Sequence, residues 1–155
     1  MNLQAMTWLL LLKVKTMLDL SNTVKSNKSD QLNADDLISG PKMVQVEGVR
    51  LTNDQQQPLH IFYIGCEGKP FKPCLTVRRI LVHLWGADGE QWAGKWLNLY
   101  VDKTVSFGKQ KNIGGIRVNA MSHIQGTARV KLTSGRGIKT EYIIEPITLN
   151  NQQGA

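Results

Sequence analysis

Hydrophobic and polar residues alternate along several short stretches of the chain, the pattern of β-strands with one buried face. After Pro41 the alternation predicts a first pair of strands at Lys42–Leu51 and Pro58–Gly65, separated by a turn signal at Asn53 and Asp54. Four more strands are predicted, at Lys95–Asp102, Gly115–Ile124, Thr127–Ser134 and Lys139–Ile147. The first pair is predicted to form a hairpin with a loop of several residues. Glycines between the last two strands indicate a tight hairpin turn.

One stretch between the second and third strands has the periodicity of a helix. Its apolar residues follow the spacing i, i+3, i+4, i+7, i+8, at Val77, Ile80, Leu81, Leu84 and Trp85, and Gly86 ends it. A strand is the alternative, because the run contains two valines and an isoleucine. A shorter helix is predicted in residues 34–38, where Asn33 is placed to cap the first turn and Gly40-Pro41 stops it.

Six short strands with one helix after the second predict a mainly β protein, with the architecture of a small OB-like β-barrel. The OB fold has five strands and its helix between the third and fourth, so the match is approximate. We assign residues 42–149 to this domain, residues 1–41 to a poorly ordered N-terminal extension with short helices, and residues 150–155 to a frayed tail. The apolar run in residues 8–12 is far shorter than the ~20 residues that span a bilayer, and lysines follow it rather than precede it. We therefore expect neither a membrane span nor an export signal.

The charge of the chain lies on its predicted folded part. The net charge is +7; residues 1–41 contain four lysines and four acidic residues, whereas residues 42–155 contain fifteen Lys or Arg and eight acids. A basic domain attracts polyanions through counterion release, which favours nucleic acid over small substrates. A surface that is merely basic and soluble is the alternative.

The sequence shows no arrangement typical of an enzyme, a metal site or a cofactor site. Cys66 and Cys74 are separated by seven residues, which is not a zinc-ligand spacing, and the three histidines stand apart. His123 follows Ser122, but adjacent residues on a strand point to opposite faces, so we expect no Ser–His pair. The prediction is a binding protein without catalytic residues, metal or cofactor.

Basic and aromatic residues interleave along the chain, as single-stranded nucleic acid requires for backbone tracking and base stacking. In the strand at Lys95–Asp102, Trp96, Asn98 and Tyr100 share one face. The predicted nucleic-acid-binding residues are Lys69, Phe71, Lys72, Arg78, Arg79, Trp96, Tyr100, Phe107, Lys109, Lys111 and Arg117. If nucleic acid binds, the seven cations of this set are expected to lie on one continuous surface, with Phe71, Tyr100 or Phe107 exposed among them. The alternative for Trp96 and Tyr100 is packing under the helix or under the loop carrying Trp92.

Four segments resemble a family of small bacteriophage and prophage proteins: SDQLNADDLISGP, GKPFKPCLTVRRILVHLWG, LNLYVD and GGIRVNAMSHI. The resemblance runs from about Gln31 to Ile147. It implies a phage origin and a location in the host-cell cytoplasm, and it assigns no functional residues.

The charge, the interleaved aromatics and the resemblance together predict a single-stranded DNA-binding accessory protein of phage recombination or replication. Its partners would be single-stranded DNA and a replication or recombination protein, with no membrane. The alternative is a phage interaction protein that binds and modulates a host factor, such as a defence nuclease or a replication protein.

Overall fold

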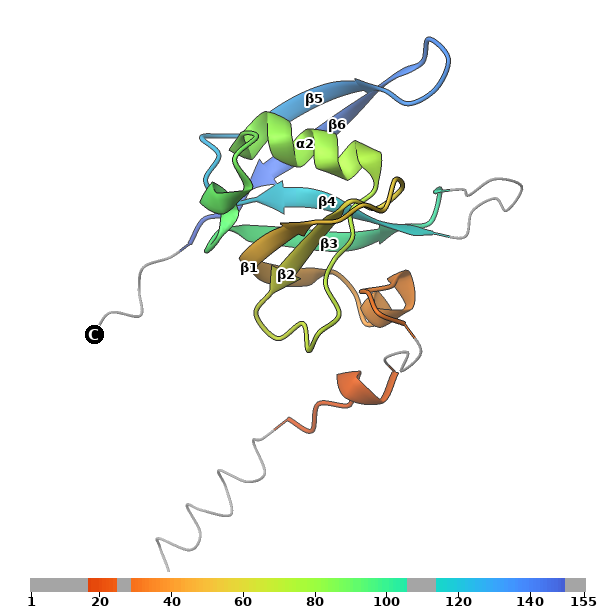
Figure 1. Cartoon of the computed structure of the whole chain (residues 1–155), viewed down its shortest axis with the longest axis vertical. Helices are drawn as coiled ribbons and strands as arrows, with labels where there is room; N and C mark the ends of the chain where they lie inside the picture. The colour runs from red at the N-terminus through yellow and green to blue at the C-terminus, as the bar shows by residue number, and fades with distance from the viewer. Residues whose placement is uncertain (1–16, 25–28, 106–113, 150–155) are drawn as a thin grey trace, which may run out of the picture.

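The computed structural model describes residues 17–24, 29–105 and 114–149 (Figure 1). The expected helix is α2 (Leu75–Trp85), and the six expected strands are β1 (Lys42–Leu51), β2 (Leu59–Tyr63), β3 (Trp96–Asp102), β4 (Gly115–Met121), β5 (Ala128–Thr133) and β6 (Lys139–Pro146). Three 3-10 helices accompany them: η1 (Ser21–Val24), η2 (Ala34–Leu37) and η3 (Gly89–Trp92). Over the described residues, the mainly β class with one α-helix is confirmed, as is the helix in place of its strand alternative.

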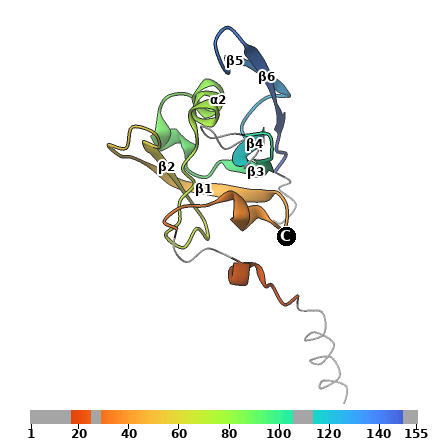
Figure 2. The same cartoon turned by 90° about the vertical axis from the view of Figure 1, so that its right-hand side faces the viewer.

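The strands form one mixed sheet with the order β2-β1-β3-β4-β6-β5. Neighbouring strands are antiparallel except β4 and β6, which are parallel. The sheet curls around α2, with β1 and β2 on one side of the helix and β5 and β6 on the other (Figure 2).

The described strands do not close into the expected barrel, because β2 and β5 form two separate edges. The β5–β6 hairpin joins the rest of the sheet through only two paired positions, Ala120 with Glu145 and Met121 with Pro146. Beyond these positions the hairpin diverges from β4, and α2 occupies the space between the two edges (Figure 1).

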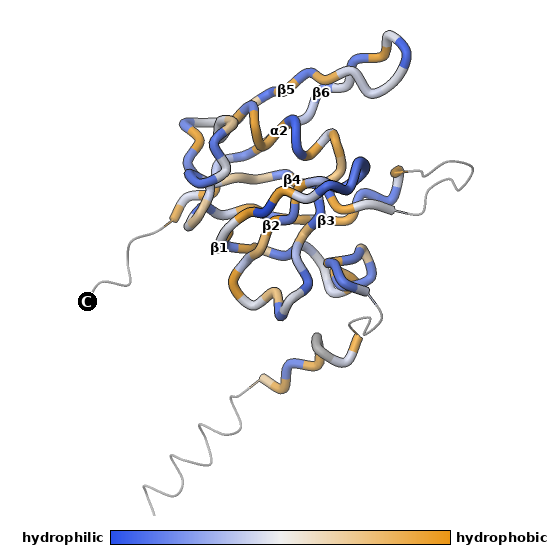
Figure 3. Tube along the Cα trace, viewed as in Figure 1, coloured by the Kyte–Doolittle hydropathy of each residue, from blue (hydrophilic) through white to orange (hydrophobic). Residues whose placement is uncertain are grey.

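The core lies between α2 and the concave face of the sheet. Helical spacing brings Val77, Ile80 and Leu81 to this side of α2, and all three are buried. In β3 the alternation gives the expected division, with Leu97 and Leu99 fully buried and the polar-aromatic residues on the other face half-buried. The same alternation of hydrophobic and hydrophilic positions is visible along the strands in Figure 3.

The segment before β1 contributes to this core. Leu32 and Leu37 are buried, and the main-chain N–H of Leu32 donates to the carbonyl of Pro70 at 3.0 Å. The predicted short helix is present as η2, where the Asp36 carboxylate accepts a 2.8 Å hydrogen bond from the N–H of Asn33. The packed unit therefore begins before residue 42, because two leucines of the predicted extension are buried in its core.

Within the described ranges, no helix is both long enough and apolar enough to cross a membrane.

Candidate nucleic-acid interface

Three of the predicted binding residues, Phe71, Lys72 and Arg117, converge on a cleft at the N-terminal end of α2. The cleft has a volume of about 570 Å³. The loop between β2 and α2 supplies Phe71 and Lys72, and β4 supplies Arg117. Its other lining residues include Gln31, Asn33, Asp35, Gln57, Cys74, Leu75 and Thr76. Four separate parts of the chain thus meet here.

Phe71 is part of the floor of the cleft rather than an exposed platform. Its N–H donates to the carbonyl of Ile61 at 2.9 Å, and its carbonyl accepts from the Ile61 N–H at 2.8 Å. This bridge to β2 sends the ring into the core, where the residue is 1% exposed. The expectation of an exposed Phe71 is therefore wrong. The lysines on either side of Phe71 suggested a solvated loop. The bridge instead gives this loop the alternation of a strand.

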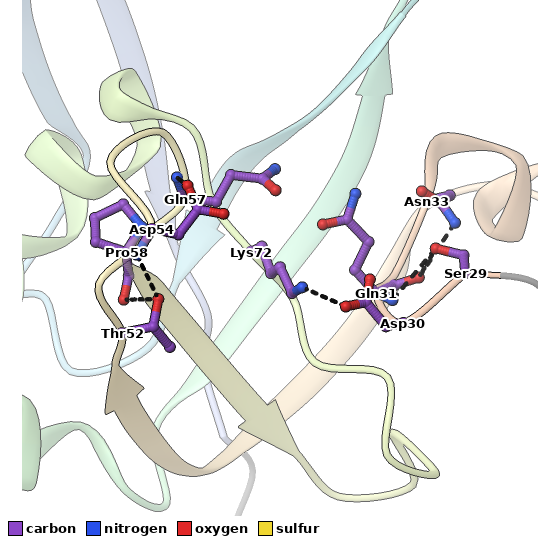
Figure 4. Close-up of polar contacts among 9 residues, drawn as sticks. All are labelled: Ser29, Asp30, Gln31, Asn33, Thr52, Asp54, Gln57, Pro58 and Lys72. Carbon is purple, nitrogen blue, oxygen red and sulfur yellow. Dashed lines mark hydrogen bonds and ion pairs between the residues drawn. The ribbon is translucent and has the colours of Figure 1, made fainter.

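Lys72 is a fixed cation at the rim of the cleft. Its Nζ lies 3.0 Å from Asp30 Oδ2, and the side chain of Lys72 is 11% exposed whereas that of Asp30 is 84% exposed. Figure 4 shows Lys72 between Asp30 and Gln31 on one side and the loop carrying Gln57 on the other. The Lys72 ammonium holds the pKa of the Asp30 carboxyl below its usual value. Because Asp30 is so exposed, a phosphate group would compete with it for Lys72.

Arg117 supplies the second cation. Its Nη1 donates to the Sγ of Cys74 at 2.8 Å. A thiol is a weak acceptor, and a guanidinium has five N–H donors, so most of the donor capacity of Arg117 is left for an anion. Tyr100 pairs with Arg117 across β3 and β4 and stands beside the cleft without lining it. Burial raises the pKa of the Tyr100 hydroxyl, against a smaller lowering effect of the Arg117 charge.

The start of α2 adds a partial positive charge to the same cleft. Cys74 is the N-cap residue, and its side chain makes no capping hydrogen bond. The first main-chain hydrogen bond of the helix runs from the Arg78 N–H to the Cys74 carbonyl. The N–H groups between these two residues, in the first turn, therefore have no partner inside the helix. Unpaired N–H groups and the helix dipole make such an end favourable for anions.

The other predicted binding residues do not join this cleft. Lys69 lines a separate small hollow with Tyr63 and Asp36. Arg78 and Arg79 line a groove between α2 and β5. Trp96 lies at the far end of β3 from Tyr100, opposite Gln45 of β1. One further turn of α2 carries the two arginines toward β5, while Arg78 Nη2 donates at 3.2 Å to the carbonyl of Gln56, next to the cleft residue Gln57. The single continuous surface stays a prediction.

Phe107, Lys109 and Lys111 lie outside the described residues. The two ends of their loop, Val105 and Gly114, are described, and both line the cleft.

Sequence reasoning missed the side-chain amides of Gln31, Asn33 and Gln57. These residues come from the segment before β1 and from the β1–β2 loop, and only the packing of Leu32 and the hairpin brings them together. No local pattern marks them. Arg129 and Lys131, which line the α2–β5 groove, could be recognised as neighbours from the sequence, because the alternation of β5 places both on one face.

The structure corrects the expectation for Ser122 and His123. Ser122 Oγ lies 2.7 Å from His123 Nδ1. Strand alternation does not apply here, since β4 ends at Met121 and His123 has a φ of 58°. Ser122 Oγ also accepts a 2.7 Å hydrogen bond from the Trp96 N–H. Ser122 is 1% exposed and joins the start of β3 to the end of β4, whereas His123 is exposed.

The described residues contain no group of three His, Cys, Asp or Glu side chains that could hold a metal ion. Both cysteines are free thiols and half-buried. Comparisons with models of protein families, with curated proteins and with solved structures found no match.

Proposed function

We propose that this chain is a single-stranded DNA-binding accessory protein of phage recombination or replication, and that the strand binds in the cleft at the start of α2. The observation that carries the proposal is the convergence of Lys72, Arg117 and the uncapped end of α2 on one cleft. Two cations and a helix N-terminus provide what a phosphate needs.

The lining of the cleft also suits a nucleotide. The amides of Gln31, Asn33 and Gln57 offer both donors and acceptors for base edges or sugar hydroxyls. The predicted cations Lys109 and Lys111 lie outside the described residues, and in sequence they fall between Val105 and Gly114, which line the cleft. Asp35, exposed on η2, is the acidic group among the described lining residues.

We expect the described lining of the cleft to contribute little base stacking. Phe71 is buried and Tyr100 half-buried, so neither presents a free ring face in the cleft. Binding is therefore expected to rest on phosphate contacts, with a steep salt dependence and little sequence preference.

The phage context of this proposal comes from the resemblance of the sequence segments, and the host-cell cytoplasm follows from that context. We propose in addition that the fold is related to the OB architecture. A curled sheet with a helix after an early strand supports it, and the cleft does not need a closed barrel.

Fluorescence anisotropy with a labelled single-stranded oligonucleotide at several salt concentrations tests the proposal. Arg117→Gln should weaken binding and reduce the salt slope by about 0.7, the value for one lost phosphate contact on a single strand. Arg50→Gln is the matched control, because Arg50 lies on β1 over the Phe62 ring at 5.4 Å and does not line the cleft. Absence of binding by the unmodified chain at low salt would refute the proposal.

A protein partner is the second candidate function. The observation that favours it is the free edge of β5 beside the groove that contains Arg78 and Arg79.

A further inference from the structure

The groove between α2 and β5 is a second surface, separate from the cleft at the start of α2. It has a volume of about 530 Å³. One wall is the outer side of α2, with Arg78, Arg79, Val82 and His83, and the other is β5 from Arg129 to Leu132. No described residue lines both the groove and the cleft.

The β5 wall is an edge strand, and its unpaired main-chain groups can be assigned. Among the described strands β5 pairs only with β6. The N–H of Ser134 donates to the carbonyl of Ile138, which makes this pair a hydrogen-bonded one. Because such pairs alternate along an antiparallel ladder, the N–H and C=O groups of Arg129, Lys131 and Thr133 point to the free edge.

The side chains at this edge alternate as well. Val130 is buried and Leu132 half-buried, and both belong to or pack against the core, whereas Arg129 and Lys131 are exposed on the other face. Val82 of α2, 44% exposed, continues the apolar floor. A strand added to β5 would therefore meet an apolar floor with one set of its side chains and two cations with the other.

The charge of this region is strongly positive. Within α2 and the span from β5 to β6 there are six Lys or Arg and two Glu, a net charge of +4. Arg129 is partly compensated by Glu141 at 3.3 Å, while the structure gives Lys131 no ion pair with a described residue. An added strand must therefore bring negative charge.

We propose that the free edge of β5 binds an extended acidic segment of a partner protein, which joins the sheet as a further strand. Residues 1–16, 25–28, 106–113 and 150–155 contain no Asp or Glu, so none of these segments has the acidic character that the edge requires. A second copy pairing through β5 would place like charges opposite each other, which is unfavourable. Cations on an edge strand are a known protection against such self-pairing.

A nucleic-acid strand suits this groove less well than a polypeptide. The free edge alternates N–H donors with C=O acceptors, which another β-strand satisfies and a row of phosphates does not. The floor formed by Val82, Val130 and Leu132 has no aromatic ring for base stacking.

The test uses the full chain and two labelled peptides, one in which Glu alternates with Val and one in which Lys replaces each Glu. The Glu peptide should bind, and it should slow amide hydrogen exchange at Arg129, Lys131 and Thr133. The Lys peptide should not bind. Equal binding of both peptides, or unchanged exchange at the three amides, overturns the proposal.

Two substitutions separate charge from main-chain pairing. Lys131→Gln should weaken Glu-peptide binding about 2- to 5-fold, as for one lost cross-strand charge pair. Thr133→Pro removes an outward N–H without removing a bond to β6, and should weaken binding about 2- to 10-fold, whereas Thr133→Val should not. The exchange measurement on the unmodified chain remains decisive if the proline variant fails to fold.

The outcome is independent of the proposed DNA site. Arg117→Gln should leave peptide binding unchanged. An oligonucleotide that protects the β5 amides and displaces the Glu peptide would assign the groove to nucleic acid and overturn the proposal.

Discussion

The indole Nε1 of Trp85 donates a 2.8 Å hydrogen bond to the main-chain carbonyl of Ser122, and the contact is buried. It joins the last residue of α2 to the residue that follows β4. Ser122 also receives the Trp96 N–H on its hydroxyl, so one residue holds α2, β3 and the end of β4 together. The cleft and the groove of the two proposals both lie along α2, and this bond helps to fix the helix against the sheet.

Trp85→Phe should destabilise the fold by about 1–3 kcal/mol, since it leaves the buried Ser122 carbonyl without its indole donor. The free energy of unfolding from urea denaturation measures this effect. Trp92→Phe is the matched control: its Nε1 donates to the Gly86 carbonyl at 3.1 Å in a partly buried contact. A Trp85→Phe loss no larger than the control loss would contradict the assignment.

Deleting residues 1–41 should destabilise the protein much more than deleting residues 1–28. The longer deletion removes Leu32 and Leu37, both buried in the core, and burial of two leucines contributes about 3–6 kcal/mol. Thermal melting of the two truncated chains beside the full chain measures the difference. Equal melting temperatures would show that residues 29–41 do not contribute to the core.

The alkaline stability of the protein should depend on Tyr63. Burial raises the pKa of Tyr63 to about 12, against about 10 in an unfolded chain. A raised pKa stabilises the fold below pH 10, and this contribution is lost as the pH rises from 10 toward 12. The free energy of unfolding of the unmodified chain should therefore fall between pH 10 and pH 12. In Tyr63→Phe the free energy of unfolding should change less over the same range. An absorbance titration of the phenolate in which no tyrosine ionises near pH 12 would contradict the raised pKa.

Replacing Lys109 and Lys111 together by Ala should weaken binding to single-stranded DNA and flatten its salt dependence. Each lost phosphate contact lowers the slope by about 0.7. The same anisotropy titration used for Arg117 measures it, with Lys42→Ala as a control, because Lys42 does not line the cleft. A weakened affinity with an unchanged salt slope would indicate that the loop acts through folding and not through phosphate contacts.

The strands and the helix were predictable from the sequence because their signals are local. Alternation depends on neighbouring residues, and the spacing of Val77, Ile80 and Leu81 identifies one buried face of α2 without reference to the rest of the chain. The same local reasoning identified the short turn capped by Asn33, now η2, and the two faces of β3.

Only the tertiary structure decided the order of the strands, the open sheet and the division of the cations between two surfaces. Strand order and closure depend on long-range pairing, and the two-position contact between β4 and β6 has no local signature. Phe71 was misjudged for the same reason, since its burial comes from a bridge to Ile61, ten residues away. The sequence by itself determined which residues are charged and which elements they occupy. Long-range packing decided that Lys72 and Arg117 meet at the start of α2 while Arg78 and Arg79 face β5, because such packing depends on contacts between residues far apart in the chain.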